Sequence, residues 1–210
     1  HESDESLEGL ADNWRTQTDA RVRSAVVEKL TNRYRDETPA LIQGVLENEK
    51  NPAILANAIR GLGRFHGPAT HEALLKFLNT KSFRNELAVA AMSAIRQLDD
   101  DDLQPAVFKS LRENAKQFRS RDYGRDLETL AHTSRRLKDR SEVRQFLTAH
   151  LDHPKASIQA AAVQALGTLG DPKAITVLES VSQSQNERIS RPAQQAVSKL
   201  REVKPTTPKE

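Results

Sequence analysis

Residues 158–171 read Ile-Gln-Ala-Ala-Ala-Val-Gln-Ala-Leu-Gly-Thr-Leu-Gly-Asp, and this stretch decides the fold. Its apolar residues Ile158, Ala161, Ala162 and Leu166 follow the spacing i, i+3, i+4 and i+8, which places them on one face of an α-helix. Similar spacings occur at Val22-Ala25-Val26-Leu30, Ile54-Ala58-Leu62, Leu87-Ala90-Ala91-Ile95, Leu127-Leu130-Ala131 and Ile189-Ala193-Val197. The chain therefore contains six copies of one helical pattern.

The copies return at a nearly constant interval. The step from Val22 to Ile54 is 32 residues, and the step from Ile54 to Leu87 is 33 residues. A fixed period between about 20 and 50 residues is typical of a stacked repeat array. Because each helix has only a narrow apolar stripe, it needs a partner helix and a neighbouring repeat to bury that stripe. We therefore predict an all-α fold, an α-solenoid or superhelix of about six antiparallel helix pairs with an ARM-like architecture.

The pattern also predicts domain limits and helix ends. Residues 1–203 are expected to form a single repeat domain, and the proline-containing tail 204–210 is expected to be disordered. Thr38 and Pro39 are a suitable N-cap and first helical residue. Pro192 is expected in a first turn, so the last helix should begin near Ser190. Helices are also expected over residues 1–15, 19–34, 83–98 and 103–118.

Composition limits the function classes. The chain of 210 residues is 37% hydrophobic and 4% aromatic, with a formal net charge of +3 and no cysteine. Disulfides and thiolate metal sites are therefore excluded. No apolar run approaches the length of about 18 residues that a transmembrane helix needs, so no membrane partner is expected. Since the chain begins at His1 rather than methionine, we expect a domain of a longer protein or a processed product.

The repeats resemble HEAT-type helical repeats, of the short kind also found in phycobilisome-lyase-like proteins. The paired alanines at 161 and 162, the Leu-Gly at 166 and 167, and Gly170-Asp171-Pro172 carry this resemblance, which extends over most of residues 17–203. It implies a binding or scaffold domain. Its concave surface would be lined by partner-helix residues such as Gln43, Lys76, Lys109 and Arg144.

A narrower resemblance concerns bacterial zinc aminopeptidases of the aminopeptidase-N type, which end in a HEAT-like domain. Residues 58–66, Ala-Ile-Arg-Gly-Leu-Gly-Arg-Phe-His, and 82–86, Ser-Phe-Arg-Asn-Glu, are similar to that C-terminal domain. The resemblance implies an accessory domain that packs on a catalytic unit and restricts substrate access. The family's zinc site lies in the catalytic domain, which this chain lacks.

No catalytic, cofactor or metal site is predicted in this chain. His71-Glu72 begins like the zinc motif His-Glu-x-x-His, but Leu75 stands where the second histidine is required. No Gly-x-Ser-x-Gly nucleophile motif is present. The group His150, Asp152 and His153 is either a metal site or an exposed turn, and the turn is the favoured interpretation.

One irregular stretch is the candidate binding site. The step from Leu87 to Leu127 is 40 residues, and the added length lies around Gln117–Arg125. We expect a basic loop whose candidate binding residues, together with Arg144 further along the chain, are Arg119, Arg121, Tyr123 and Arg125. Such a loop could hold an acidic partner or a phosphate backbone. The alternative is a longer solvated turn whose arginines pair with Asp122, Asp126 and Glu128.

Three functions are compatible with these observations. The first is a non-catalytic binding or scaffold domain whose partner is a protein or peptide, including a catalytic domain of the same parent chain. The second is nucleic-acid binding, as in HEAT-like DNA glycosylases, but the small net charge disfavours it. The third is an enzyme such as a chromophore lyase, which only the repeat type supports.

Overall fold

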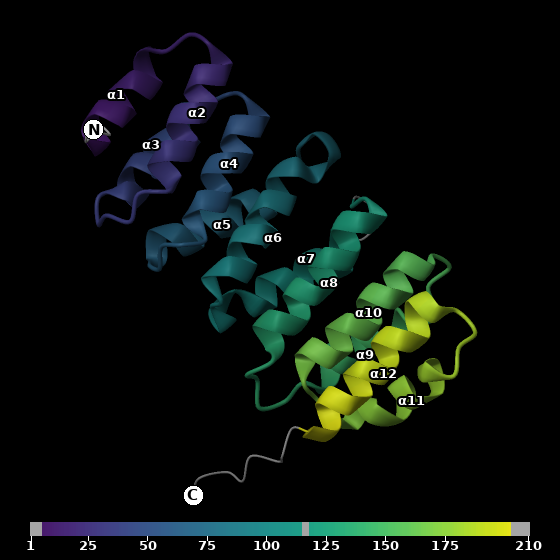
Figure 1. The fold of residues 1–210 in the computed structure, drawn as a ribbon. Helices are drawn as coiled ribbons and strands as arrows, with labels where there is room; N and C mark the ends of the chain where they lie inside the picture. The colour runs from purple at the N-terminus through teal and green to yellow at the C-terminus, as the bar shows by residue number, and fades with distance from the viewer. Residues whose placement is uncertain (1–5, 115–117, 203–210) are drawn as a thin grey trace, which may run out of the picture. The chain divides into compact units, whose positions relative to one another are not determined.

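The computed structural model describes residues 6–114 and 118–202, and the predicted tail 204–210 lies outside these residues. The described residues contain twelve α-helices and three short 3-10 helices, with no β-strand among them (Figure 1). Contacts divide the chain into two compact units, residues 1–99 and 100–210. The all-helical prediction is confirmed.

The first unit contains three helix pairs. Its helices are α1 (Leu7–Thr16), α2 (Ala20–Thr31), α3 (Thr38–Asn48), α4 (Pro52–Leu62), α5 (Pro68–Leu78) and α6 (Glu86–Leu98), the last preceded by a 3-10 turn over Phe83–Asn85. Helices α2, α4 and α6 pack side by side in one row, while α3 and α5 connect them as antiparallel partners (Figure 1). The row corresponds to the first three copies of the sequence pattern.

The second unit repeats this arrangement. Its helices are α7 (Gln104–Asn114), α8 (Ser120–Ser134), α9 (Ser141–Ala149), α10 (Ala156–Leu169), α11 (Ile175–Ser182) and α12 (Glu187–Glu202), with 3-10 turns over Asp101–Leu103 and Pro172–Ala174. Helices α8, α10 and α12 form the row of neighbours (Figure 1). The last three copies of the sequence pattern therefore occupy equivalent positions in this unit.

The repeated apolar positions form the cores of both units. All of the pattern residues in α4, α6, α8, α10 and α12 are buried. In α2, however, Val22 is 39% exposed and Ala25 is exposed, while Val27 is fully buried. Because α2 packs against α1 as well as α3 and α4, its core face is broader and is centred one residue later than the pattern predicts.

Two helix starts differ from the predictions. The N-cap of α3 is Glu37, and the buried Thr38 instead donates its hydroxyl hydrogen to the carbonyl oxygen of Arg33 at 2.9 Å. Helix α12 begins at Glu187, so Pro192 lies inside it rather than in its first turn. Asn186 accepts a hydrogen bond from the backbone of Arg188 at 3.1 Å and starts the helix earlier. Pro192 is half-buried and Arg188 is exposed, so water can reach the carbonyl that proline leaves unbonded.

Regular helix starts in the first unit have the residues expected of them. Asp19 accepts a hydrogen bond from the backbone N–H of Arg21 at 2.7 Å, and Asn51 accepts one from Ala53 at 3.0 Å. These caps satisfy N–H groups that have no partner within the helix. Helices α3, α5 and α6 of the same unit begin without a side-chain cap hydrogen bond.

Candidate functional site

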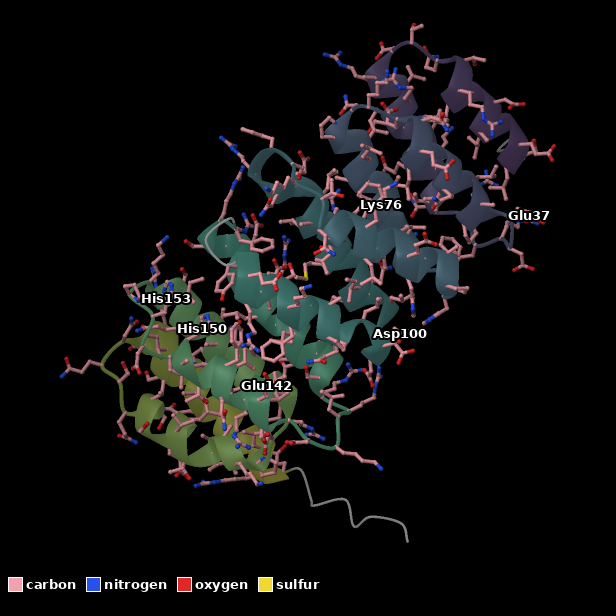
Figure 2. The ribbon with its side chains drawn as sticks, turned by 180° about the vertical axis from the view of Figure 1, so that it is seen from behind. Glu37, Lys76, Asp100, Glu142, His150 and His153 are labelled. Atoms are coloured by element: carbon pink, nitrogen blue, oxygen red, sulfur yellow. The ribbon has the colours of Figure 1, made fainter. Side chains whose placement is uncertain are left out.

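The start of α8, the end of α9 and the start of α10 meet at one edge of the second unit. Lys155 donates from its ammonium to the hydroxyl of Ser120 at 2.6 Å, and the hydroxyl of Tyr123 lies 2.8 Å from Nε2 of His150. Figure 2 shows His150 and His153 at this edge, and their rings stack with centroids 6.4 Å apart. We call this group the Ser120 cluster; it comprises Phe118, Arg119, Ser120, Arg121, Tyr123, His150, His153 and Lys155.

Aromatic and imidazole rings form the base of the Ser120 cluster. The ring of Tyr123 lies 6.4 Å from that of Phe118 and 5.5 Å from that of His150. The ring of Phe146, on α9, lies 4.7 Å from His150. Phe118 and Tyr123 are both buried. The base is therefore a packed and rigid support for the side chains around it.

Hydrogen bonds fix the orientation of His150. Its Nδ1 lies 2.8 Å from the backbone carbonyl of Phe146, which can only accept, so Nδ1 carries the hydrogen. In a neutral imidazole, Nε2 then accepts from the hydroxyl of Tyr123. Burial, together with the negative charge of Asp126, raises the pKa of Tyr123 to about 12. Tyr123 is therefore a neutral donor throughout the physiological pH range.

Cations occupy the outer part of the Ser120 cluster. Arg119, Arg121 and Lys155 are all exposed. Within the described residues, neither arginine forms an ion pair, because the neighbouring Asp122 pairs with Arg125 at 3.1 Å. Lys155 thus contacts the hydroxyl of Ser120, Arg119 and Arg121 flank Ser120 in the chain, and none of the three cations has a carboxylate partner among the described residues.

The positions of these cations are unfavourable for the isolated helices. Arg119 is the N-cap of α8 and Lys155 is the N-cap of α10, and neither makes a side-chain cap hydrogen bond. A cation at this position opposes the helix dipole, and the lack of a polar cap costs about 1 kcal/mol of helix stability. Helix α9 begins in the same way, since its N-cap Arg140 also makes no side-chain cap hydrogen bond, and it lies outside the Ser120 cluster.

The structure brings together only some of the residues predicted from the sequence. Arg119, Arg121 and Tyr123 lie in the Ser120 cluster. Arg125 pairs with Asp122 within α8, and Arg144 pairs with Asp171, which follows the end of α10. Arg125 and Arg144 therefore do not contribute to the cluster.

The prediction of a basic loop over Gln117–Arg125 is wrong for most of its length, since α8 begins at Ser120 and residues 120–125 are helical. Gln117 lies outside the described residues. Helix α8 begins 34 residues after the start of α6, the same interval as between α4 and α6, so the 40-residue step arises because Leu127 lies in the middle of α8. Tyr123 and Leu127 are both buried and hold the first turns of this helix in the core. The arginines are consequently displayed on a helix with a fixed spacing.

Lys155 was not predicted as a site residue. Ser120 and Lys155 are 35 residues apart, about one repeat, and each lies at the start of a helix in the same row. Equivalent positions in neighbouring repeats lie close in space in a stacked array. Comparison of helix starts one period apart would therefore have identified Lys155 from the sequence.

Neither a metal-binding group nor a membrane-spanning helix is found among the described residues. Within residues 6–114 and 118–202, no three His, Asp or Glu side chains are arranged to hold a metal ion. His153 uses its Nδ1 to accept from the backbone N–H of Lys155 at 3.1 Å. None of the described helices is long and apolar enough to cross a membrane.

Comparison with known proteins defines the fold class. Residues 127–198, which include most of α8 and extend into α12, match the family model of HEAT repeats. No curated protein gives a significant sequence match. One similar solved structure is the complex of CpcE and CpcF of phycocyanin lyase from Nostoc sp. PCC7120. It shares 19% identity at a TM-score of 0.60, with coverage of 90% of this chain and 74% of that chain.

A second similar structure is an engineered protein with 16% identity and a TM-score of 0.54, and the match covers 93% of this chain and 96% of that chain. At these identities the two structures show the fold alone. They confirm an all-α, HEAT-type α-solenoid as the fold class of this chain.

Proposed function

We propose that this chain is a non-catalytic protein-binding module, and that its Ser120 cluster holds an acidic segment of a partner protein. The observation that carries the proposal is a set of three exposed cations at this edge: Lys155, whose ammonium contacts the hydroxyl of Ser120, and Arg119 and Arg121, which flank Ser120 in the chain. Arginine clusters are a recurrent means of recognising acidic motifs, because the guanidinium group binds carboxylates through two parallel hydrogen bonds.

The rigidity of the cluster supports the same function. Tyr123 and His150 hold each other through a hydrogen bond between buried or half-buried side chains, and Lys155 is held by Ser120. A surface whose side chains are already ordered loses less conformational entropy when a partner binds. The fold agrees with this function, since stacked repeats present extended surfaces that bind other proteins. The similar structure of CpcE and CpcF is itself a complex of two proteins.

A peptide segment fits the cluster better than a nucleic acid does. Binding to a phosphate backbone depends on many cations that follow the strand, and it weakens steeply with salt. Here only three such cations lie at the starts of α8 and α10, and carboxylates such as Asp122 and Asp152 lie close by in the sequence. Nucleic-acid binding remains the alternative function that the experiment below must distinguish.

The parent protein is a separate question. We keep as a prediction that this module is the C-terminal accessory domain of a zinc aminopeptidase, although neither of the two similar structures described above is identified as a peptidase. It is tested on the natural product by its intact mass and by aminopeptidase assay with and without a zinc chelator. A product near the present size without chelator-sensitive activity would rule it out.

The binding proposal is tested by charge reversal. The first variant carries Arg119→Glu, Arg121→Glu and Lys155→Glu. The control variant carries Lys138→Glu, Arg188→Glu and Lys199→Glu, which changes the net charge by the same amount at exposed positions of the same unit. Fluorescence anisotropy is measured with a labelled peptide of alternating Glu and Asp and with single-stranded DNA of matched length.

We expect the dissociation constant for the acidic peptide to rise at least about tenfold in the first variant, equivalent to about 1.4 kcal/mol. The control variant should stay within about twofold of the wild type. Equal losses in both variants would show that net charge rather than the cluster binds the peptide. Tighter binding of DNA with a steep salt dependence would favour the alternative function.

A further inference from the structure

The connection between α5 and α6 presents an exposed aromatic side chain. We call residues 79–85 the α5–α6 turn. Phe83, within it, is 73% exposed, the highest value among the large hydrophobic side chains of the described residues. A single exposed apolar residue is common on protein surfaces and needs no special explanation. The backbone that holds Phe83 is what distinguishes it.

Two consecutive residues after Phe83 have left-handed backbone conformations. Arg84 has φ 54° and Asn85 has φ 55°, and neither is glycine. For residues with a Cβ, this conformation costs roughly 1–2 kcal/mol each, although asparagine tolerates it better than arginine. Strain of this kind is found preferentially at functional sites, where the surrounding structure maintains it.

Hydrogen bonds hold the α5–α6 turn in this shape. The carbonyl oxygen of Ser82 accepts from the backbone N–H of Asn85 at 3.1 Å. The hydroxyl oxygen of Ser82 accepts from the backbone N–H of Leu87 at 3.1 Å and so connects the turn to α6. At the other end, Thr80 donates its hydroxyl hydrogen to the carbonyl of Lys76 on α5 at 2.8 Å. Phe83 is therefore displayed from a turn anchored on both adjoining helices.

Cations flank the aromatic ring. The guanidinium carbon of Arg84 lies 4.8 Å from the centroid of the Phe83 ring, and Lys81 is exposed two residues before it. Within the described residues, neither cation has an ion-pair partner. The turn thus combines an ordered aromatic ring with two positive charges, and aromatic residues and arginine are enriched in protein interfaces.

We propose that the α5–α6 turn is a second binding element, in which Phe83 inserts into an apolar pocket of a folded partner protein whose rim carries carboxylates facing Lys81 and Arg84. This proposal rests on residues of the first unit and is independent of the Ser120 cluster. A projecting ring fits a pocket rather than a flat surface. Arg84 covers one face of the ring, which disfavours stacking of a nucleic-acid base on that face.

The first step of the test uses the whole chain in its cells of origin. A photo-reactive benzoyl-phenylalanine replaces Phe83, and in a control variant it replaces Tyr34, which is 68% exposed but whose ring lies 6.0 Å from that of Phe65. We expect one discrete protein adduct at position 83 and no corresponding adduct at position 34. No adduct at position 83 above the control would overturn the proposal, as would an adduct of twice the chain mass, which would identify a second copy of this chain.

In the second step, the partner protein identified from the adduct is purified and titrated with four forms of this chain. These are the wild type, Phe83→Ala, the double variant Lys81→Glu with Arg84→Glu, and Tyr34→Ala. We expect the dissociation constant to rise about tenfold or more for the first two variants and to change less than about twofold for Tyr34→Ala. Because Phe83 is exposed, its replacement should leave the thermal midpoint unchanged, so a loss of binding is not a loss of fold. Equal affinity of wild type and Phe83→Ala would overturn the proposal.

Discussion

At the scale of single residues, Glu49 joins the first three helices. Its carboxylate accepts from Nε1 of Trp14 at 3.2 Å and from Nε and Nη2 of Arg23 at 2.9 and 3.3 Å. It also accepts from the backbone N–H groups of Lys50 and Asn51, both at 2.9 Å. Burial raises the pKa of Glu49, but the hydrogen bonds from Arg23, the backbone and Trp14 outweigh burial, so its pKa lies below the ordinary value.

Glu49→Gln should therefore destabilise the first unit by about 1.5–3 kcal/mol at pH 7, the usual contribution of hydrogen bonds to a charged group. Because the folded pKa is lowered, the stabilisation by Glu49 is complete above its unfolded pKa of about 4.3 and is lost as pH falls through the folded value. The difference between wild type and variant should shrink accordingly below about pH 4. Urea unfolding followed by the fluorescence of Trp14, the sole tryptophan, measures this difference in the free energy of unfolding. Glu47→Gln, at an exposed position, is the control, and an equal effect there would contradict this role.

The pKa of Asp126 is shifted in the opposite direction to that of Glu49. It is 1% exposed, and its Oδ2 has no hydrogen-bond partner among the described residues. Burial, with a smaller contribution from Asp122, raises its pKa well above the ordinary value, against the attraction of Arg125. A buried carboxyl of this kind is stable only while it is protonated.

Wild-type stability should therefore decline relative to Asp126→Asn as pH rises. The unfolded chain ionises Asp126 above about pH 4, whereas the folded chain keeps it neutral up to its raised pKa. Urea midpoints at pH 4 and pH 8 measure the change. The exposed Asp152→Asn is the matched control and should show no such dependence. A constant difference between wild type and Asp126→Asn across this range would show that the carboxyl ionises normally.

At the scale of helices, glycine and alanine set the distance between neighbours in each row. A Cβ added to Gly63, at the end of α4, would lie 2.6 Å from the backbone oxygen of Ala94 on α6. A Cβ on Gly167, in α10, would lie 3.0 Å from the Cβ of Ala196 on α12. The rows are thus packed so closely that some positions have no space for a side chain.

Gly63→Ala should consequently cost about 1–3 kcal/mol, because the clash is with backbone that cannot rotate away. Gly44→Ala in α3 is the matched control, since no atom lies within 4 Å of its added Cβ. That substitution should stabilise the chain by roughly 0.5–1 kcal/mol through helix propensity. Thermal unfolding of both variants measures the contrast. A neutral Gly63→Ala would mean that α4 and α6 can separate without loss.

The helices themselves were largely predictable from the sequence, and their ends were less so. Period and apolar spacing identify α4 and α10 because each packs between two helices of its own row. The face of α2 was misplaced because α1 covers part of it, a tertiary effect that the repeat pattern does not contain. Pro192 was misinterpreted because proline is tolerated wherever its missing hydrogen bond falls on the solvent side.

The candidate site was only partly predictable for a related reason. Net positive charge around residue 120 identifies Arg119 and Arg121, but charge alone does not distinguish them from Arg125, which pairs with Asp122 in its own helix. The contact between Ser120 and Lys155 depends on stacking of one repeat on the next. Glu49 had no sequence signal, since its five donors come from three separate parts of the first unit.

At the scale of the whole molecule, we predict that residues 1–203 behave as one cooperative domain. Trp14 reports on the first unit, and hydrogen exchange of the α10 amides reports on the second. If the repeats unfold together, both probes should give the same urea midpoint and the same slope. Two separated transitions would show that the units at residues 1–99 and 100–210 are independent domains.

The arrangement of each row in chain order also affects synthesis. Within each unit, a row helix packs on the one that precedes it by a single repeat, as α10 packs on α8 and α12 packs on α10. When a new helix emerges from the ribosome, the surface on which it packs has therefore already been synthesised and is exposed. Apolar faces are covered within about one repeat of their synthesis, so a stalled or truncated product presents only a single uncovered helix face to chaperones. Such local contact is also the condition under which proteins fold fastest.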